Sequence, residues 1–144
     1  MPSKREQVIQ AVVALIQAAI PEAEMARNSG KPEKVGKDPL AIVNDGDPGE
    51  PEVTLCPTTY LYEHRIPVAF AASRTRALTP DAVMDAILVR LGQAIEADRT
   101  LGGLCDYLDA EAPAADVIEA QGAQTARFAE VGLIAVYATT NPLT

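Results

Sequence analysis

The chain has 144 residues, a usual size for one domain, so a single hydrophobic core suffices and we expect residues 1–144 to form a single domain. Its net charge is -8 and divides unevenly: residues 1–40 carry 6 basic and 5 acidic side chains, residues 41–144 carry 6 basic and 15 acidic ones, and all four lysines precede residue 40. Such a chain lacks the basic patch and stacking aromatics of a nucleic-acid reader, so that class of protein is disfavoured.

The first element is an amphipathic helix, which we predict from Ser3 to Ile20. Apolar residues recur every three or four positions from Val8 to Ala19, and Ser3 with Glu6 forms a capping-box pattern. Two basic residues ahead of an apolar run also occur at the start of signal peptides, but here three glutamines interrupt the run at helical spacing. We therefore expect a cytoplasmic protein.

Strands are predicted through the middle of the chain. The stretch EAEMARN (residues 22–28) suits a short strand, Ser29–Asp38 is a polar loop, and the β-branched run in PLAIVND (residues 39–45) indicates a buried strand before the turn DGDPGEP. From Tyr60 to Phe70 the even positions carry aromatic and aliphatic side chains, so one face of this strand should be buried. Pro67 cannot donate to a ladder, which predicts an edge position or a bulge there.

A second helix and further strands complete the chain. Thr79 followed by proline is an N-cap signal, and an apolar stripe then predicts a helix to about Asp98. CDYLDAEAP and RFAEVGLIAVYATTN suit strands, whereas Ala114 to Gln124 has no clear assignment. The order of helix, strands, helix, strands predicts an α+β domain: a mainly antiparallel sheet with two amphipathic helices packed on one face, in two layers.

The lysine-containing loop resembles a phosphate-binding loop in composition only. That motif has four residues between its glycines, then lysine and a hydroxyl residue that open a helix. Here Gly30 and Gly36 enclose five residues, Asp38 replaces the hydroxyl, and a predicted strand follows. We expect no nucleotide site.

The acidic turn that follows resembles a calcium loop in only two positions. Asp45 and Asp47 alternate as calcium ligands do, but the required glycine and glutamate would fall on Glu50 and Cys56. We expect a solvated turn, with no metal and no cofactor.

A cysteine and histidine pair is the remaining catalytic possibility. Cys56 and Cys105 are the only cysteines and His64 is the only histidine, and we interpret them as buried free thiols and a core histidine. Cys56 could reach His64 only through a sharp reversal at Pro57, whereas the sequence leaves a pairing of Cys105 with His64 open. A small Cys/His-dependent transferase or hydrolase is therefore the alternative from another functional class.

Several stretches together carry a resemblance to a known family. DGDPGEPEVTL before YLYEH, then ADRTLGGLCDYLDAEAP, and the terminal YATTNPL resemble the tail terminator family of long-tailed phages, the minor tail protein U-like group. The resemblance implies a small α+β domain that assembles into a ring, typically of six subunits, on the head-proximal end of the tail tube. It also implies that the protein stops tube polymerisation and presents a surface to the head completion proteins.

Further properties follow from this resemblance alone. It implies partners rather than catalysis: a second copy of the chain, the tail tube protein and the head completion proteins, with no catalytic residue, no cofactor, no membrane, and DNA only passing through the lumen. The expected location is the host cytoplasm during assembly and then the virion tail. A monomer that closes its ring only on the tube end, and another neck or tail-completion protein of similar fold, both stay open.

The resemblance also locates an assembly surface. The extended loop of the family corresponds to Ser29–Asp38 and its strand turn to Asp45–Glu52. We predict that the basic residues of the loop contact an acidic surface on a neighbouring subunit or tube protein, because the chain pairs a locally basic loop with an acidic remainder. The predicted interface comprises Lys31, Lys34, Lys37, Asp45, Asp47 and Glu50.

Overall fold

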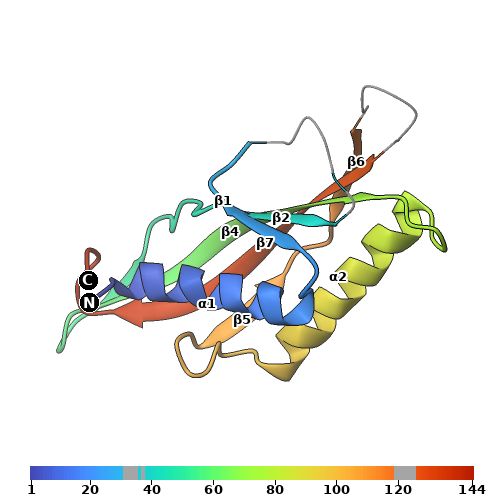
Figure 1. Cartoon of the computed structure of the whole chain (residues 1–144). Coiled ribbons are helices and arrows are strands. Elements are labelled where there is room, and N and C mark those ends of the chain that lie inside the picture. Colours follow the sequence, from blue (N-terminus) through green and yellow to red (C-terminus); the bar gives the residue numbers. More distant parts are fainter. Residues whose placement is uncertain (31–35, 37, 119–125) are drawn as a thin grey trace.

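The architecture was analysed in a computed structural model, which describes residues 1–30, 36, 38–118 and 126–144. Lys31, Lys34 and Lys37 lie outside the described residues, as does the stretch 119–125. Figure 1 shows the elements in chain order. They are α1 (Lys4–Ala19), β1 (Glu24–Arg27), β2 (Leu40–Val43), β3 (Glu52–Thr54), β4 (Thr59–Ser73), α2 (Pro80–Ala97), β5 (Tyr107–Ala110), β6 (Ala114–Ile118) and β7 (Ala126–Thr139).

Both helices begin where their capping residues predict. The Ser3 hydroxyl accepts a hydrogen bond from the backbone N–H of Glu6 at 3.2 Å, and the Thr79 hydroxyl accepts one from Ala82 at 3.3 Å. Each bond satisfies a donor of the first helical turn that has no partner within the helix. α1 ends before Pro21, so the predicted boundaries of both helices are confirmed to within a residue or two.

Within the described residues, seven strands form one mixed sheet with the central order β1-β2-β4-β7-β5. β4 and β7 pair antiparallel along almost their whole length, from Tyr60↔Thr139 to Ser73↔Ala126. β3 also pairs with β4, and β6 with β7, whereas β1 runs parallel to β2. The α+β class and the mainly antiparallel sheet are confirmed. β3 was not predicted and begins where the predicted turn ends, and β6 occupies residues 114–118 of the unassigned stretch.

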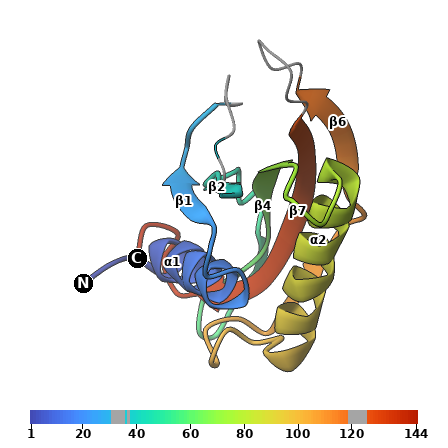
Figure 2. The same ribbon diagram turned by 45° about the vertical axis from the view of Figure 1, so that its right-hand side comes forward.

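The two helices cover the same face of the sheet, as predicted (Figure 2). The even positions of β4 point toward them, and Ile66, Val68 and Phe70 are fully buried in one cluster with residues of α1 and α2. The odd positions Glu63 and Arg65 are exposed on the opposite face. Neither described helix covers that outer face, which the long strands β4 and β7 dominate.

Pro67 occupies a position that the sequence only partly predicted. The expected edge position is wrong, because β4 has β2 on one side and β7 on the other. The backbone of Pro67 faces β2, where its carbonyl accepts from Asn44 at 2.9 Å just beyond the end of that strand. Successive residues of a strand direct their backbone N–H and C=O groups to opposite neighbours. The absence of an N–H on Pro67 therefore removes no hydrogen bond between β4 and β7.

The pairing beside Pro67 is nevertheless irregular, as the sequence suggested. Asn44 bonds to Pro67 and Asp47 forms a bridge with Arg65, so two residues of the acidic turn stand opposite Ile66 alone. One of them is Gly46, whose φ is +67°. The turn is thereby bent against the centre of β4.

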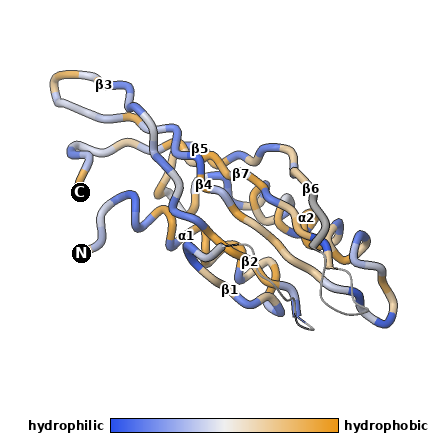
Figure 3. The backbone as a smooth tube through the Cα atoms, turned by 90° about the horizontal axis from the view of Figure 1, so that it is seen from above, coloured by the Kyte–Doolittle hydropathy of each residue, from blue (hydrophilic) through white to orange (hydrophobic). Residues whose placement is uncertain are grey.

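The long strands set the extended outline of the molecule. β3 and its hairpin turn lie at one end, as Figure 3 shows, and both chain ends lie on that side. The turn from β4 into α2 lies at the opposite end (Figure 1). The two ends of β4 therefore present different surfaces.

Candidate functional site

The acidic turn between β2 and β3 contains the three described residues of the predicted interface. Asp45 accepts from Arg27 Nε at 2.8 Å, and the same guanidinium binds both carboxylate oxygens of Glu6 at 2.6 and 2.7 Å. The hydrogen bonds from Arg27 lower the pKa of Glu6. Asp45 therefore joins α1, β1 and the turn rather than being wholly available to a partner.

The other two acidic residues differ from Asp45 in their availability. The Asp47 carboxylate accepts the backbone N–H of Gly49 at 2.9 Å and so stabilises the turn itself. Both Asp47 and Glu50 are exposed. Among the described residues no ion pair engages Glu50, so its charge is available for a contact with another molecule.

A buried histidine holds this turn on the sheet. His64 is fully buried, and its ring lies between the backbone carbonyl of Asp45, 2.6 Å from Nε2, and the hydroxyl of Tyr137, 3.0 Å from Nδ1. A carbonyl can only accept, so Nε2 carries the proton and donates, and the tyrosine hydroxyl donates to Nδ1. This arrangement fits the neutral ring. It also matches the interpretation of His64 as a core histidine.

Burial determines the acid–base properties of this cluster. Desolvation lowers the pKa of His64, and the charge of Arg5 acts in the same direction. Burial raises the pKa of Tyr137 to about 12. Both groups are thus uncharged near neutral pH, and both ring nitrogens of His64 are engaged.

The two cysteines lie in different environments, and the prediction that both are buried is wrong for Cys56. Cys56 is exposed in the turn between β3 and β4, because that hairpin projects from the body of the domain. Cys105 is buried, and its thiol lies 3.8 Å from the Arg99 carbonyl. Burial raises the pKa of the Cys105 thiol, with the charge of Asp106 adding to the effect, which is the opposite of nucleophile activation.

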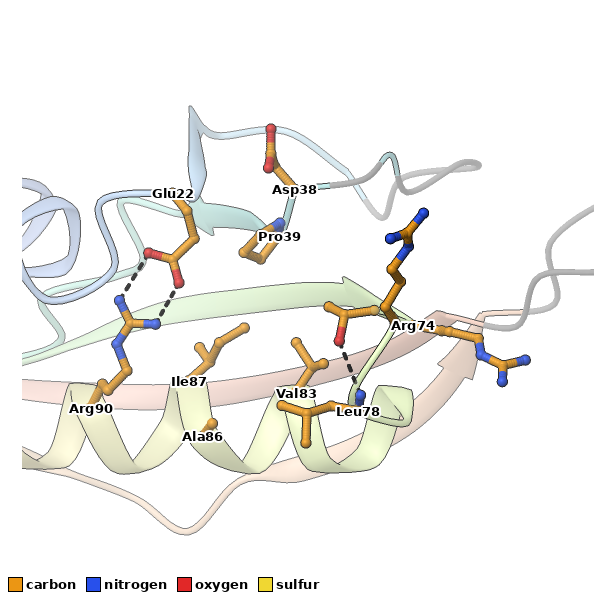
Figure 4. A pocket seen from close by; sticks show the side chains of 11 residues that line it. Glu22, Asp38, Pro39, Arg74, Leu78, Val83, Ala86, Ile87 and Arg90 are labelled. Carbon is orange, nitrogen blue, oxygen red and sulfur yellow. Dashed lines mark hydrogen bonds and ion pairs between the residues drawn. The ribbon is translucent and has the colours of Figure 1, made fainter.

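A pocket that the sequence analysis missed lies between α2, the β1–β2 connection and the turn after β4. Its volume is about 510 Å³. Figure 4 shows Arg90 paired with Glu22 at one end and Arg74 at the other, with Val83 and Ile87 between them. The lining residues, here named the arginine pocket, are Glu22, Asp38, Pro39, Arg74, Thr75, Arg76, Leu78, Val83, Ala86, Ile87 and Arg90.

The charges of the arginine pocket divide into paired and available ones. Arg90 binds both carboxylate oxygens of Glu22, which lowers the pKa of that carboxyl to about 2, and its Nε donates to the Ala19 carbonyl at 3.1 Å. Arg74 and Arg76 are exposed, and no ion pair engages either of them within the part of the chain that the structure describes. The sequence analysis did not identify this site, whose only trace in the sequence is the pair Arg74 and Arg76 a few residues after the predicted strand.

A second missed feature is the projecting hairpin at the other end of β4. β3 pairs with the start of β4, from Glu52↔Leu61 to Thr54↔Thr59. Two large apolar side chains are unusually open to solvent there, because Val53 is 48% and Leu55 is 74% exposed. The residues 50–59 are named the acidic hairpin below, since their only charged side chains are Glu50 and Glu52.

The described residues contain neither a metal-binding cluster nor a membrane-spanning helix. No group of three or more His, Cys, Asp or Glu side chains there is placed to hold a metal ion. Neither helix described has the combination of length and apolar character needed to cross a membrane.

Comparison with known proteins adds no assignment. No family model matches the chain, and no curated protein matches it.

Proposed function

We propose that this chain is a phage or prophage tail terminator, which forms a ring on the head-proximal end of the tail tube. In this role it stops tube polymerisation and provides the surface to which the head completion proteins bind. The fold suits such a ring because its sheet has one face packed on the two helices and another that neither described helix covers.

The charge of the outer sheet face is the observation that carries this proposal. The β4–β7 register places Glu63 and Glu130 on the same face as Arg65. Arg65 is paired with Glu111 at 3.0 Å, so the cation is already neutralised. A lumen lined by this face would be acidic, and DNA could pass without adhering because phosphates gain nothing from carboxylates.

The predicted loop contact belongs to the same proposal. In the sequence, Lys31, Lys34 and Lys37 lie within seven residues before Asp38, which lines the arginine pocket. Replacing the three lysines by serine should weaken ring formation and binding to tubes. Ring formation and tube binding equal to those of the unmodified protein would refute the lysine contact.

The decisive experiment is analytical ultracentrifugation of the purified protein, alone and with assembled tail tubes, followed by electron microscopy of the tube ends. We expect the protein to form hexameric rings, which appear as added density at one end of each tube. Growth of the tubes should stop at that end. A protein that remains monomeric and ignores tubes under all conditions would contradict the proposal. Binding to head completion proteins without an effect on tube growth would instead indicate another neck or tail-completion component.

A further inference from the structure

The arginine pocket has a defined chemical preference. Its floor is apolar, with Val83 and Ile87 from α2 beside Leu78, which is 45% exposed. Its rim carries Arg74 and Arg76, neither of which forms an ion pair with a described residue. Asp38 also lines the pocket, but the two arginine charges outnumber its single negative charge. A volume of about 510 Å³ lies in the range of pockets that enclose a ligand-sized group. The pocket suits an occupant that is apolar at its tip and carries carboxylates beside that tip.

The acidic hairpin has this combination of groups. Within β3 the alternation of side chains places Val53 on one side and Glu52 on the other. Leu55 follows in the exposed turn, and Glu50 lies just before the strand. The sequence contains no lysine or arginine from Asp38 to His64, so no cation of this stretch opposes an approach to the arginines. Exposed apolar side chains of this size favour removal from water.

The two features cannot meet within one molecule. The acidic hairpin ends where β4 begins at Thr59, whereas Arg74 directly follows the last residue of β4, Ser73. A strand rises about 3.3 Å per residue, so roughly 45 Å separates them along β4. They accordingly lie at opposite ends of the molecule in Figure 1, and only a second copy can bring them together.

We propose that the acidic hairpin of one copy inserts into the arginine pocket of the next. This inference rests on the proposed ring and names the contact that joins its subunits. Two different patches then meet in every interface, which is the head-to-tail arrangement that closes into a ring when the rotation allows. Val53 and Leu55 are the central anchor on the apolar floor, and Glu50 and Glu52 pair with Arg74 and Arg76 at its rim.

Charge exchange tests the contact directly. The variants E50R/E52R and R74E/R76E alter exposed side chains, so both should fold, which circular dichroism checks. Each variant alone should self-associate at least about tenfold more weakly than the unmodified protein, because every interface then juxtaposes like charges. An equal mixture of the two variants should regain association, because reversed hairpin meets reversed pocket and normal hairpin meets normal pocket around the ring. Failure of the mixture to recover would overturn the inference.

Cysteine cross-linking supplies an independent geometric test. Cys56 is an exposed thiol in the hairpin turn, and Thr75 is an exposed residue of the pocket. Unmodified protein mixed with the variant C56S/T75C should yield mixed disulfide dimers under mild oxidation, since each chain then has one accessible thiol. The matched control C56S/Q93C, with a cysteine on an exposed part of α2 outside the pocket, should yield none. Predominant Cys56–Cys56 dimers would show that hairpins meet each other and would overturn the inference.

Both tests should be run in concentrated solution and on tube ends, so that failures of the two proposals can be told apart. Mixed dimers and charge rescue without any effect on tube growth would keep the hairpin contact and refute the terminator. Tube capping by R74E/R76E as efficient as by the unmodified protein would refute the hairpin contact and keep the terminator. Cross-linking of the T75C thiol to the tube protein, or no mixed dimer under either condition, would also refute the contact.

Discussion

Replacing Tyr137 by phenylalanine tests whether the buried histidine fastens the acidic turn. The tyrosine is 2% exposed, and its hydroxyl is the donor to Nδ1 of His64 at 3.0 Å. The substitution removes only that hydroxyl and retains the ring. Nδ1 then stays buried without a donor, and the opposite tautomer gives no relief, because Nε2 would face the carbonyl of Asp45 without a proton to donate.

The expected cost follows from this unsatisfied group. A buried acceptor that loses its donor destabilises a protein by about 1–3 kcal/mol. With a urea m-value of about 2 kcal/mol/M, the middle of the usual range, the unfolding midpoint should fall by roughly 0.5–1.5 M. Far-ultraviolet circular dichroism at pH 7.5 is the appropriate assay because the chain has no tryptophan.

Tyr62→Phe provides the matched control for this measurement. The Tyr62 ring lies 5.8 Å from the Tyr137 ring and is 8% exposed, but no described residue forms a hydrogen bond to its hydroxyl. Loss of this hydroxyl should change the free energy of unfolding by less than about 0.5 kcal/mol. If Tyr137→Phe has an effect no larger than the control, the histidine does not depend on this donor and the reasoning fails.

Three further measurements address other parts of the structure. Burial lowers the pKa of His64 from 6.5, so the unfolded chain takes up a proton at this site before the folded chain does as the pH falls. The free energy of unfolding should therefore drop by at most about 1.4 kcal/mol from pH 8 to pH 5.5. An increase in the free energy of unfolding over this range, measured by urea titration, would contradict the expectation. Gly46→Ala should cost more than about 2 kcal/mol in chemical denaturation, since φ is +67° and a Cβ would collide with the backbone of β4. Gly132→Ala should cost less than about 1 kcal/mol, because only the ends of an exposed ion pair would move, and equal costs would refute the distinction. Iodoacetamide should modify Cys56 in the native protein and Cys105 only after unfolding, whereas rapid native modification of Cys105 would revive the enzyme alternative.

The elements with local signals could be predicted from the sequence. Ser3 and Thr79 mark helix starts because a capping side chain acts within three residues of itself. The alternation from Tyr60 to Phe70 identified the buried face of β4, since side chains alternate along any strand. These signals need no information about the rest of the fold.

The features that depend on neighbouring strands could not be predicted in this way. Pro67 predicted an edge strand, but β4 tolerates this proline because the backbone of Pro67 faces the end of β2. The sequence alone does not reveal where the neighbouring strand β2 ends. Cys56 seemed a core thiol because cysteine is often buried, but β3 and β4 form a hairpin that projects beyond the sheet. Parallel pairing of β1 with β2 likewise has no local signature.

The candidate site was difficult to predict because it brings together distant stretches of chain. The arginine pocket combines Glu22 of the α1–β1 connection and Asp38 of the β1–β2 connection with residues of the β4–α2 turn and α2. Only the start of the acidic hairpin, as far as Glu52, fell within the predicted turn, and its strand β3 was not predicted. The lysines of the predicted interface fall outside the described residues, so their contact stays a prediction.

Internal pairing explains why overall charge was an incomplete guide to the assembly surface. Asp45 counts as an acidic interface residue in the sequence, but Arg27 already binds it. Most of the arginines described are likewise committed to partners within the chain, at Arg27, Arg65, Arg90, Arg99 and Arg127. Such exposed pairs add little stability, but they reduce the charge that is available to another molecule. The charges that can act between molecules are therefore those left over, and at the β4–α2 end of the described structure they include Arg74 and Arg76 at the rim of the pocket.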